Sequence, residues 1–162
     1  MKIVSFNSDS AQEFNSGNFR GVIPARAINK LPGHSYTILS VRGWLDARPE
    51  SVRACNLADI IVVQRVAVSE TLSYIEKWRK QGKTVCFDQD DQYEMLENDN
   101  QAYKFWKRGL VEVQLAENIK YEKRLDKHPI ESLKECLKLC SAGTAPGKLL
   151  VDYWKTYGNM RF

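Results

Sequence analysis

Residues 58–91, ADIIVVQRVAVSETLSYIEKWRKQGKTVCFDQDD, hold two short apolar runs separated by an amphipathic segment. The runs DIIVVQR (59–65) and KTVCFD (83–88) are rich in β-branched and other apolar residues, as is typical of strands buried on both faces of a parallel sheet. Between them, apolar residues recur at helical spacing, at Leu72, Ile75 and Trp78. Gly82 follows as a left-handed helix stop. The stretch therefore predicts a strand, a helix and a second parallel strand.

The flanking sequence extends this pattern in both directions. KIVSF (2–6) and YTILSV (36–41) predict two more strands, and apolar residues between Phe19 and Leu31 predict a helix that ends near Gly33. Alternating strands and helices are the mark of a doubly wound layer. We therefore predict an α/β fold: a three-layer Rossmann-like domain with a mostly parallel sheet that takes up residues 1–162.

The second half of the chain is more polar. Residues 92–109 are irregular in pattern, and the heavily charged stretch 110–140 predicts mostly helix, with a break at Pro129. LCSAGTA (139–145) predicts a short strand and a turn, and PGKLLVDYWKTYG (146–158) predicts a helix. The final NMRF would begin another strand.

Composition narrows the classes of function. The 162 residues are 43% hydrophobic and 27% charged, with a net charge of +4, so the chain suits one globular domain and no nucleic-acid partner is predicted. The cysteines form no CxxC pair, and they occur at Cys55, Cys86, Cys136 and Cys140. This pattern favours reduced thiols and a cytoplasmic protein. The lack of a GxGxxG motif argues against a dinucleotide, and no cofactor is expected.

Polar residues follow four of the predicted strands. Because ligands of open parallel sheets bind beyond the carboxyl ends of the strands, we expect these residues to converge there. The candidates for binding a ligand are Ser16, Gly17, Asn18, Arg20, Arg65, Asp88 and Thr144, and the candidates for catalysis are Asp90 and Asp91. Ser16-Gly17-Asn18 either offers N–H groups at a helix start or is a plain loop and cap.

Three carboxylates crowd the end of the fourth strand. They could hold a metal, act as a catalytic base, grip sugar hydroxyls or anchor a turn. A calcium loop is excluded, because Tyr93 stands where that turn requires glycine. Arg65 ends an apolar strand and needs an anionic partner, which could be Asp88, Asp90 or a ligand.

The segment AYKFWKRG (102–109) mixes three aromatic and three cationic residues. Its aromatic side chains are expected to pack in the core while its cations stay solvated. A peripheral contact with a membrane surface, or a contact with an acceptor, is the alternative.

Several of these stretches together resemble a known enzyme family. They are FRGVIPARAINKLPGHSYTIL (19–39), ADIIVVQR (58–65), GKTVCFDQDDQYEML (82–96) and CLKLCSAGTAPGKLLVDYWKTYGN (136–159). In this order they resemble the N-terminal domain of GT-B glycosyltransferases, in the group related to glycosyltransferase family 4. FDQDD with the upstream VVQR is the most specific part. SAGTAP departs from the family, in which that strand is more apolar.

The resemblance implies a function for the strand-end edge. In this family the N-terminal domain mainly receives the sugar acceptor, and the nucleotide-sugar binds chiefly to a second, similar domain. By this resemblance, the chain would be the acceptor-side domain, inactive without a donor domain and without a metal requirement. Either Asp90 or Asp91 would orient or deprotonate an acceptor hydroxyl.

Two other functions stay open on the sequence alone. One is a metal-dependent transferase of GT-A type, in which the DxD of Asp88 and Asp90 holds a divalent ion and a nucleotide-sugar. The other is a non-catalytic α/β module that binds a glycan or a partner.

Overall fold

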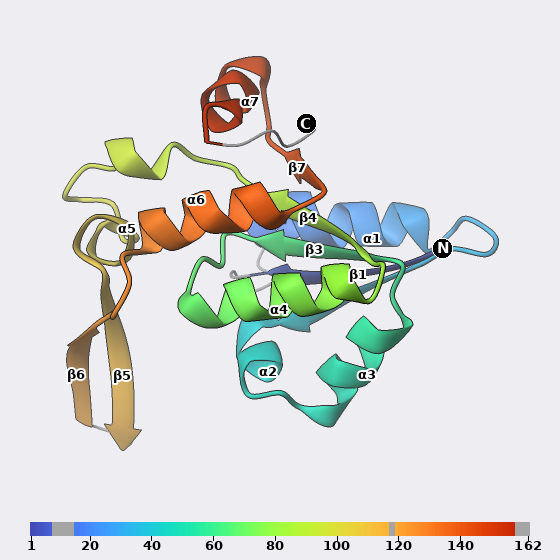
Figure 1. The fold of residues 1–162 in the computed structure, drawn as a ribbon, viewed down its shortest axis with the longest axis horizontal. Coiled ribbons are helices and arrows are strands. Elements are labelled where there is room, and N and C mark those ends of the chain that lie inside the picture. Colours follow the sequence, from blue (N-terminus) through green and yellow to red (C-terminus); the bar gives the residue numbers. More distant parts are fainter. Residues whose placement is uncertain (8–14, 117–118, 158–162) are drawn as a thin grey trace.

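The computed structural model describes residues 1–7, 15–116 and 119–157. Its centre is a five-stranded, fully parallel sheet in the order β2-β1-β3-β4-β7, with helices on both faces (Figure 1). The strands are β1 (Lys2–Asn7), β2 (Ser35–Ser40), β3 (Ile60–Gln64), β4 (Thr84–Asp88) and β7 (Ala142–Thr144). The predicted three-layer α/β fold and its mostly parallel sheet are confirmed.

One face of the sheet carries the main core. Because side chains alternate along a strand, this face receives every second side chain of the three central strands. These are Val4 and Phe6 from β1, Ile61 and Val63 from β3, and Val85 and Phe87 from β4. It is covered by α2 (Val41–Leu45), α3 (Pro49–Leu57), α4 (Ser69–Lys80) and α6 (Pro129–Leu139). Phe6 stacks on Trp44 and Trp78, with ring centroids 4.5 and 5.8 Å away. The stacked aromatic rings thus pack α2 and α4 against β1.

The opposite face is covered by the π-helical turn η1 (Asn18–Val22) and by α1 (Ile23–Ile28), which lies behind the sheet in Figure 1. The apolar cluster on this side is small: among the residues that the structure describes, it buries Ile3, Ala25 and Tyr36. Toward the carboxyl ends of the strands, this face becomes polar, with buried Asn7, Gln64 and Asp88. The predicted helix between Phe19 and Leu31 is therefore confirmed in outline, and it ends before Leu31.

The prediction of mostly helix over 110–140 is wrong for its first half. β5 (Leu110–Ala116) and β6 (Ile119–Arg124) form an antiparallel hairpin that projects from the domain (Figure 1). LVEVQ alternates apolar and polar residues with a period of two, which favours a strand. Charged side chains of the two strands form ion pairs with one another, such as Lys120 with Glu112 at 2.7 Å. The expected break at Pro129 is confirmed, because α6 begins there.

The aromatic segment after β4 folds back onto the domain. η2 (Tyr93–Met95) and α5 (Tyr103–Arg108) add two short helices to a stretch predicted to be irregular. Trp106 is buried and stacks on buried Tyr93 with ring centroids 4.0 Å apart, whereas the three cations of α5 are exposed. The prediction that the aromatic residues here pack in the core is confirmed for Trp106 and, in part, for Phe105, whereas Tyr103 lies outside the core cluster. The stack of aromatic rings also fixes the chain just beyond the three carboxylates.

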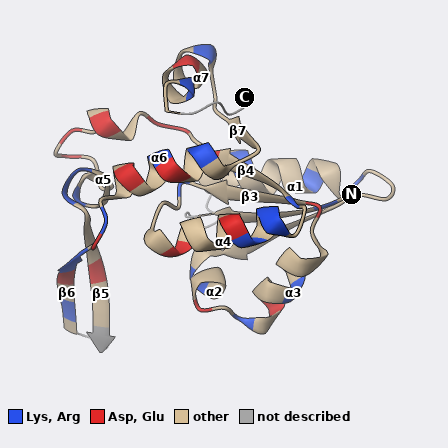
Figure 2. Cartoon of the chain, in the orientation of Figure 1, with Lys and Arg blue, Asp and Glu red and all other residues tan. Residues whose placement is uncertain are grey.

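The end of the described chain follows the prediction. β7 lies within the predicted strand, and α7 (Lys148–Lys155) lies within the predicted helix. The strand expected at NMRF falls outside the described residues. Within the described ranges, no helix is long and apolar enough to cross a membrane. Positive and negative side chains are interleaved over α4, α6 and the hairpin (Figure 2).

Candidate functional site

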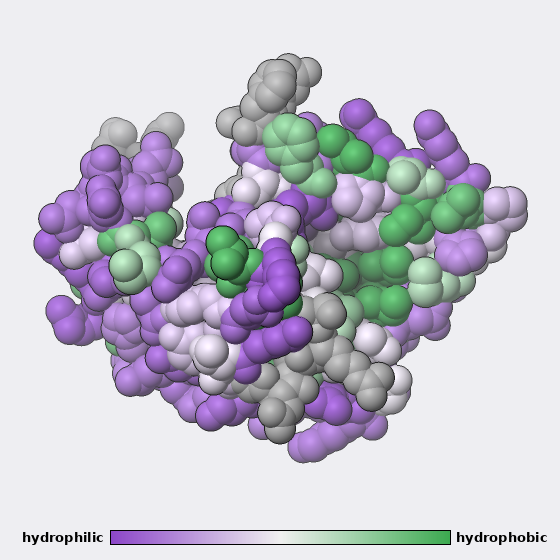
Figure 3. All heavy atoms as spheres, turned by 90° about the horizontal axis from the view of Figure 1, so that it is seen from above, coloured by the Kyte–Doolittle hydropathy of each residue, from purple (hydrophilic) through white to green (hydrophobic). Residues whose placement is uncertain are grey.

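The candidate site lies at the carboxyl ends of three neighbouring strands. The parallel register places Gln64 beside Asp88, and Asp88 beside Thr144. Arg20 reaches them from η1 on the helix-poor face. The structure thus brings together Arg20, Asp88 and Thr144, which the sequence predicted to converge. Figure 3 shows a hollow between the lobe that carries the hairpin and the body of the sheet, on the side toward which the strands point.

Asp88 is the centre of a closed hydrogen-bond network. Arg20 grips its carboxylate with two donors, Nε to Oδ2 at 2.7 Å and Nη2 to Oδ1. The Thr144 hydroxyl donates to Oδ1, and the Gln64 amide donates to Oδ2 at 3.3 Å. The Asp88 side chain is only 6% exposed. Its hydrogen bond raises the pKa of Arg20 despite the opposing effect of burial.

These contacts decide what Asp88 can do. Both oxygens already accept hydrogen bonds from protein donors, so a cation at the DxD of Asp88 and Asp90 would have to displace them. In the part of the chain that the structure describes, no three His, Cys, Asp or Glu side chains gather as a metal site. The geometry gives Asp88 a positioning role: it joins η1, β3, β4 and β7 at the edge of the sheet.

Arg65 forms a second pair on the other side of the strand ends. Its Nη1 lies 3.4 Å from Oδ2 of Asp90, and the Tyr93 hydroxyl donates to Oδ1 of Asp90 at 2.8 Å. The expectation that Arg65 would lie within ion-pair reach of Asp88 or Asp90 is confirmed with Asp90. Arg20 takes the place at Asp88 instead.

The backbone of Arg65 adopts an unusual conformation. Its φ is +54°, in the left-handed region that residues other than glycine rarely adopt. Its N–H donates to the carbonyl of Asp88 at 3.2 Å. Such strain persists only where surrounding contacts hold it, and it is found frequently at ligand sites. Here it turns the arginine out of the strand direction and toward Asp90.

Asp91 is the carboxylate of the cluster that is left available. It is exposed, and it forms no hydrogen bond or ion pair with any described residue. Partial burial raises the pKa of Asp91, and the negative charge of Asp90 adds to this, while Arg65 opposes it. A carboxylate with a raised pKa is a better proton acceptor than an ordinary one. Of the two candidates for the base, Asp91 is therefore the one free to meet a ligand.

The segment Ser16-Gly17-Asn18 offers less to a ligand than expected. The Asn18 N–H already donates to the Oδ1 of Asn15 at 2.9 Å. Gly17 is buried, and its carbonyl accepts from the Asn7 amide at 3.4 Å. These contacts fit the plain loop and cap better than a set of free N–H groups. Ser16 is half-buried beside them.

Four polar residues of this edge were not among the candidate binding or catalytic residues named from the sequence. Gln64 and Tyr93 hold Asp88 and Asp90, and Asn7 lies against Gly21, where a β-carbon would come within 1.9 Å of the Asn7 amide nitrogen. Gln89 is fully buried, and its side-chain amide has no partner among the described residues. Three of them end or directly follow a strand, which is the signal that could have identified them.

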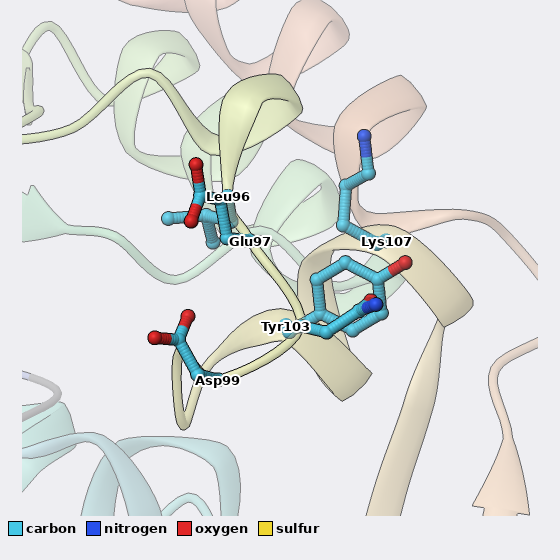
Figure 4. Close-up of a pocket in the computed structure, with 6 residues that line it drawn as sticks. Leu96, Glu97, Asp99, Tyr103 and Lys107 are labelled. Carbon is cyan, nitrogen blue, oxygen red and sulfur yellow. The ribbon is translucent and has the colours of Figure 1, made fainter.

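A separate pocket lies beyond this edge. It has a volume of 490 Å³ and is lined by residues of the loop before α5 and of α5 itself. Figure 4 shows Glu97 and Asp99 on one side of it and Tyr103 and Lys107 on the other. Lys107 donates to the carbonyl of Glu94 at 2.6 Å, which turns it away from the two carboxylates. This pocket shares no residue with the strand-end network.

The comparisons with known proteins give no assignment. No family model and no curated protein matches the sequence. Among solved structures, the chain is similar to a conserved protein from Enterococcus faecalis V583, with a TM-score of 0.44 and 13% identity over 96% of this chain and 98% of that one. A similarity at this level does not extend to function. The resemblance of the sequence to glycosyltransferases therefore stays a prediction.

Proposed function

We propose that the chain is the acceptor-side domain of a GT-B-type glycosyltransferase, with Asp91 as the group that receives the acceptor proton. The observation that carries the proposal is that, in the described part of the chain, two of the three carboxylates are paired with arginines and the third is not. Arg20 engages Asp88, and Arg65 engages Asp90. Asp91 stays exposed at the edge where open parallel sheets bind ligands, with its pKa raised.

In the proposed reaction, the oxygen of an acceptor hydroxyl forms a bond to the anomeric carbon of a nucleotide-sugar. The bond from that carbon to the diphosphate oxygen breaks, and the hydroxyl proton passes to Asp91. Asp90 keeps its charge close to Asp91, and that charge makes Asp91 hold a proton more readily. Arg65 and Tyr93 fix Asp90 by contacts of 3.4 and 2.8 Å.

The donor would bind elsewhere. A nucleotide diphosphate needs several positive groups, because electrostatic stabilisation of the leaving group dominates such transfers. The two arginines near the edge are already paired with aspartates. The proposal therefore includes a second domain that binds the nucleotide-sugar, and no transfer by this chain alone.

A non-catalytic glycan-binding module is the second candidate. It is favoured by the same pairing, since Arg20, Asp88, Arg65 and Asp90 neutralise one another and build a polar edge with Thr144. Both candidates predict sugar binding, and they differ in whether Asp91 must accept a proton.

Sugar binding can be tested by titrating the ¹⁵N-labelled chain with a panel of methyl hexosides and following the amide shifts. We expect shifts centred on the segment from Asp88 to Asp91 and on Thr144. In Asp91→Asn, affinity should fall about tenfold, because a hydrogen bond to a charged group contributes roughly 1.5–3 kcal/mol. Asp99→Asn, which removes an exposed carboxylate from the Figure 4 pocket, is the matched control and should bind like the wild type. Shifts confined to other parts of the molecule would refute the proposal.

A further inference from the structure

We infer that the acceptor carries an alkyl chain, and that this chain lies in an apolar groove that begins at Arg65. The inference rests on the proposed function, and it adds the chemical class of the acceptor. The groove is built by the elements that surround the carboxyl end of β3: α2, the loop from β3 to α4, and α5.

The first part of the groove adjoins the carboxylate cluster. It is a pocket of 350 Å³, and apart from Arg65 and Ala102 its walls are large apolar side chains, namely Val41, Leu45, Val66, Val68, Phe105 and Trp106. Small-molecule sites are usually apolar cavities of about 300–1,000 Å³ with a few polar groups that set orientation. Arg65 is that polar group here, and it contacts Asp90.

A second pocket continues the first. It has a volume of 240 Å³ and shares Leu45 and Val68 with its neighbour. Its other lining residues are Leu125 and five polar or charged side chains, namely Ser69, Glu70, Lys123, Asp126 and Lys127. The two pockets therefore form one continuous groove, which is apolar in its first pocket and mainly polar and charged in its second.

The shape and polarity of the groove select one kind of occupant. A linear alkyl chain can lie along the apolar walls of the first pocket as far as Leu45 and Val68, which the second pocket shares. The hydroxylated head group of the same molecule would lie at the end of the groove formed by Arg65, beside Asp90 and Asp91. Asp91 directly follows Asp90 in the chain, and the carboxylate of Asp90 lies 3.4 Å from the guanidinium of Arg65. An alkyl glycoside has both parts in the required order.

The test compares hexyl β-D-glucopyranoside with methyl β-D-glucopyranoside by calorimetry, with the hexyl compound kept below the concentration at which it forms micelles. Burial of each CH₂ is worth up to about fourfold in affinity. For five additional carbons, we expect the hexyl compound to bind at least about tenfold more tightly. Methyl resonances of Val66 and Val68 should shift with the hexyl compound only.

Two variants locate the effect. Leu45→Gln places an amide in the wall that both pockets share, and it should abolish the advantage of the hexyl compound while leaving the methyl compound unchanged. Leu45 is 37% exposed, so the variant is expected to fold. Leu57→Gln, at an exposed position at the end of α3 and outside the groove, is the matched control and should keep the advantage.

The outcomes separate the two proposals. Equal binding of both glucosides, or an advantage that survives Leu45→Gln, would overturn the alkyl-groove inference and leave the proposed sugar site standing. Binding of neither compound would overturn the proposed function and this inference with it.

Discussion

Replacing Arg20 by methionine should destabilise the domain strongly, because it leaves the Asp88 carboxylate buried without its cation. Arg20 grips both oxygens of Asp88, whose side chain is 6% exposed. Breaking a buried pair by removing one partner typically costs about 3–5 kcal/mol. Arg20 itself is 20% exposed, and Gln64 and Thr144 keep their hydrogen bonds to Asp88. We therefore expect about 3 kcal/mol, a large part of the roughly 5–15 kcal/mol that stabilises a domain.

The assay is urea unfolding followed by tryptophan fluorescence, which gives the midpoint and the slope. Asp88→Asn in the Arg20→Met background should recover part of the loss, because it removes the unpaired charge; the double-mutant cycle measures this coupling. Lys148→Met is the control, since it breaks the exposed pair with Asp152 and should barely move the midpoint. If Arg20→Met moves the midpoint no further than Lys148→Met, Asp88 does not hold the strand ends together.

Three further results are expected. Gly21→Ala should cost about 1–3 kcal/mol, measured by the same unfolding assay, because its β-carbon would lie 1.9 Å from the Asn7 amide; an unchanged midpoint would show that Asn7 moves freely. Calorimetry with manganese at millimolar levels should show no specific binding, whereas micromolar affinity that is lost in Asp90→Asn would favour the metal-dependent alternative. In the native protein, Ellman's reagent at pH 8 should barely react with Cys136 or Cys140, because burial raises the pKa of Cys136 to about 12 and that of Cys140 well above its usual value; rapid reaction before unfolding would contradict their burial.

The sheet could be predicted because its strands have strong local signals. The run at 59–65 is apolar on both faces of β3, because Ile61 and Val63 lie in the main core while Ile60 and Val62 pack against the smaller cluster. The convergence of Arg20, Asp88 and Thr144 followed from the fold rule for parallel sheets. The pair of Arg65 and Asp90 followed from the need of a buried arginine for an anion.

Other elements have no comparable local signal. α3 buries only Ser51 and Cys55, so its sequence shows no apolar stripe. The hairpin was mistaken for a helix because its many charges suggested a solvated helix, although VEVQL alternates with a period of two. The sequence named Arg20 as a candidate without identifying it as the partner of Asp88, since Arg20 lies 68 positions away and the packing of η1 on the strand ends brings it close.

The assignment of Asp91 as proton acceptor can be tested by measuring its pKa with ¹³C-carboxyl NMR, with and without a saturating methyl hexoside that binds the strand-end edge. In the free protein, we expect a pKa above the usual value for aspartate, because of partial burial and the charge of Asp90. A hydroxyl that donates to the charged carboxylate favours the ionised form, so the sugar should lower this pKa, and sugar affinity should rise as pH increases through it. A pKa that stays unchanged when the site is saturated would contradict the assignment, because it would mean that no acceptor hydroxyl meets Asp91.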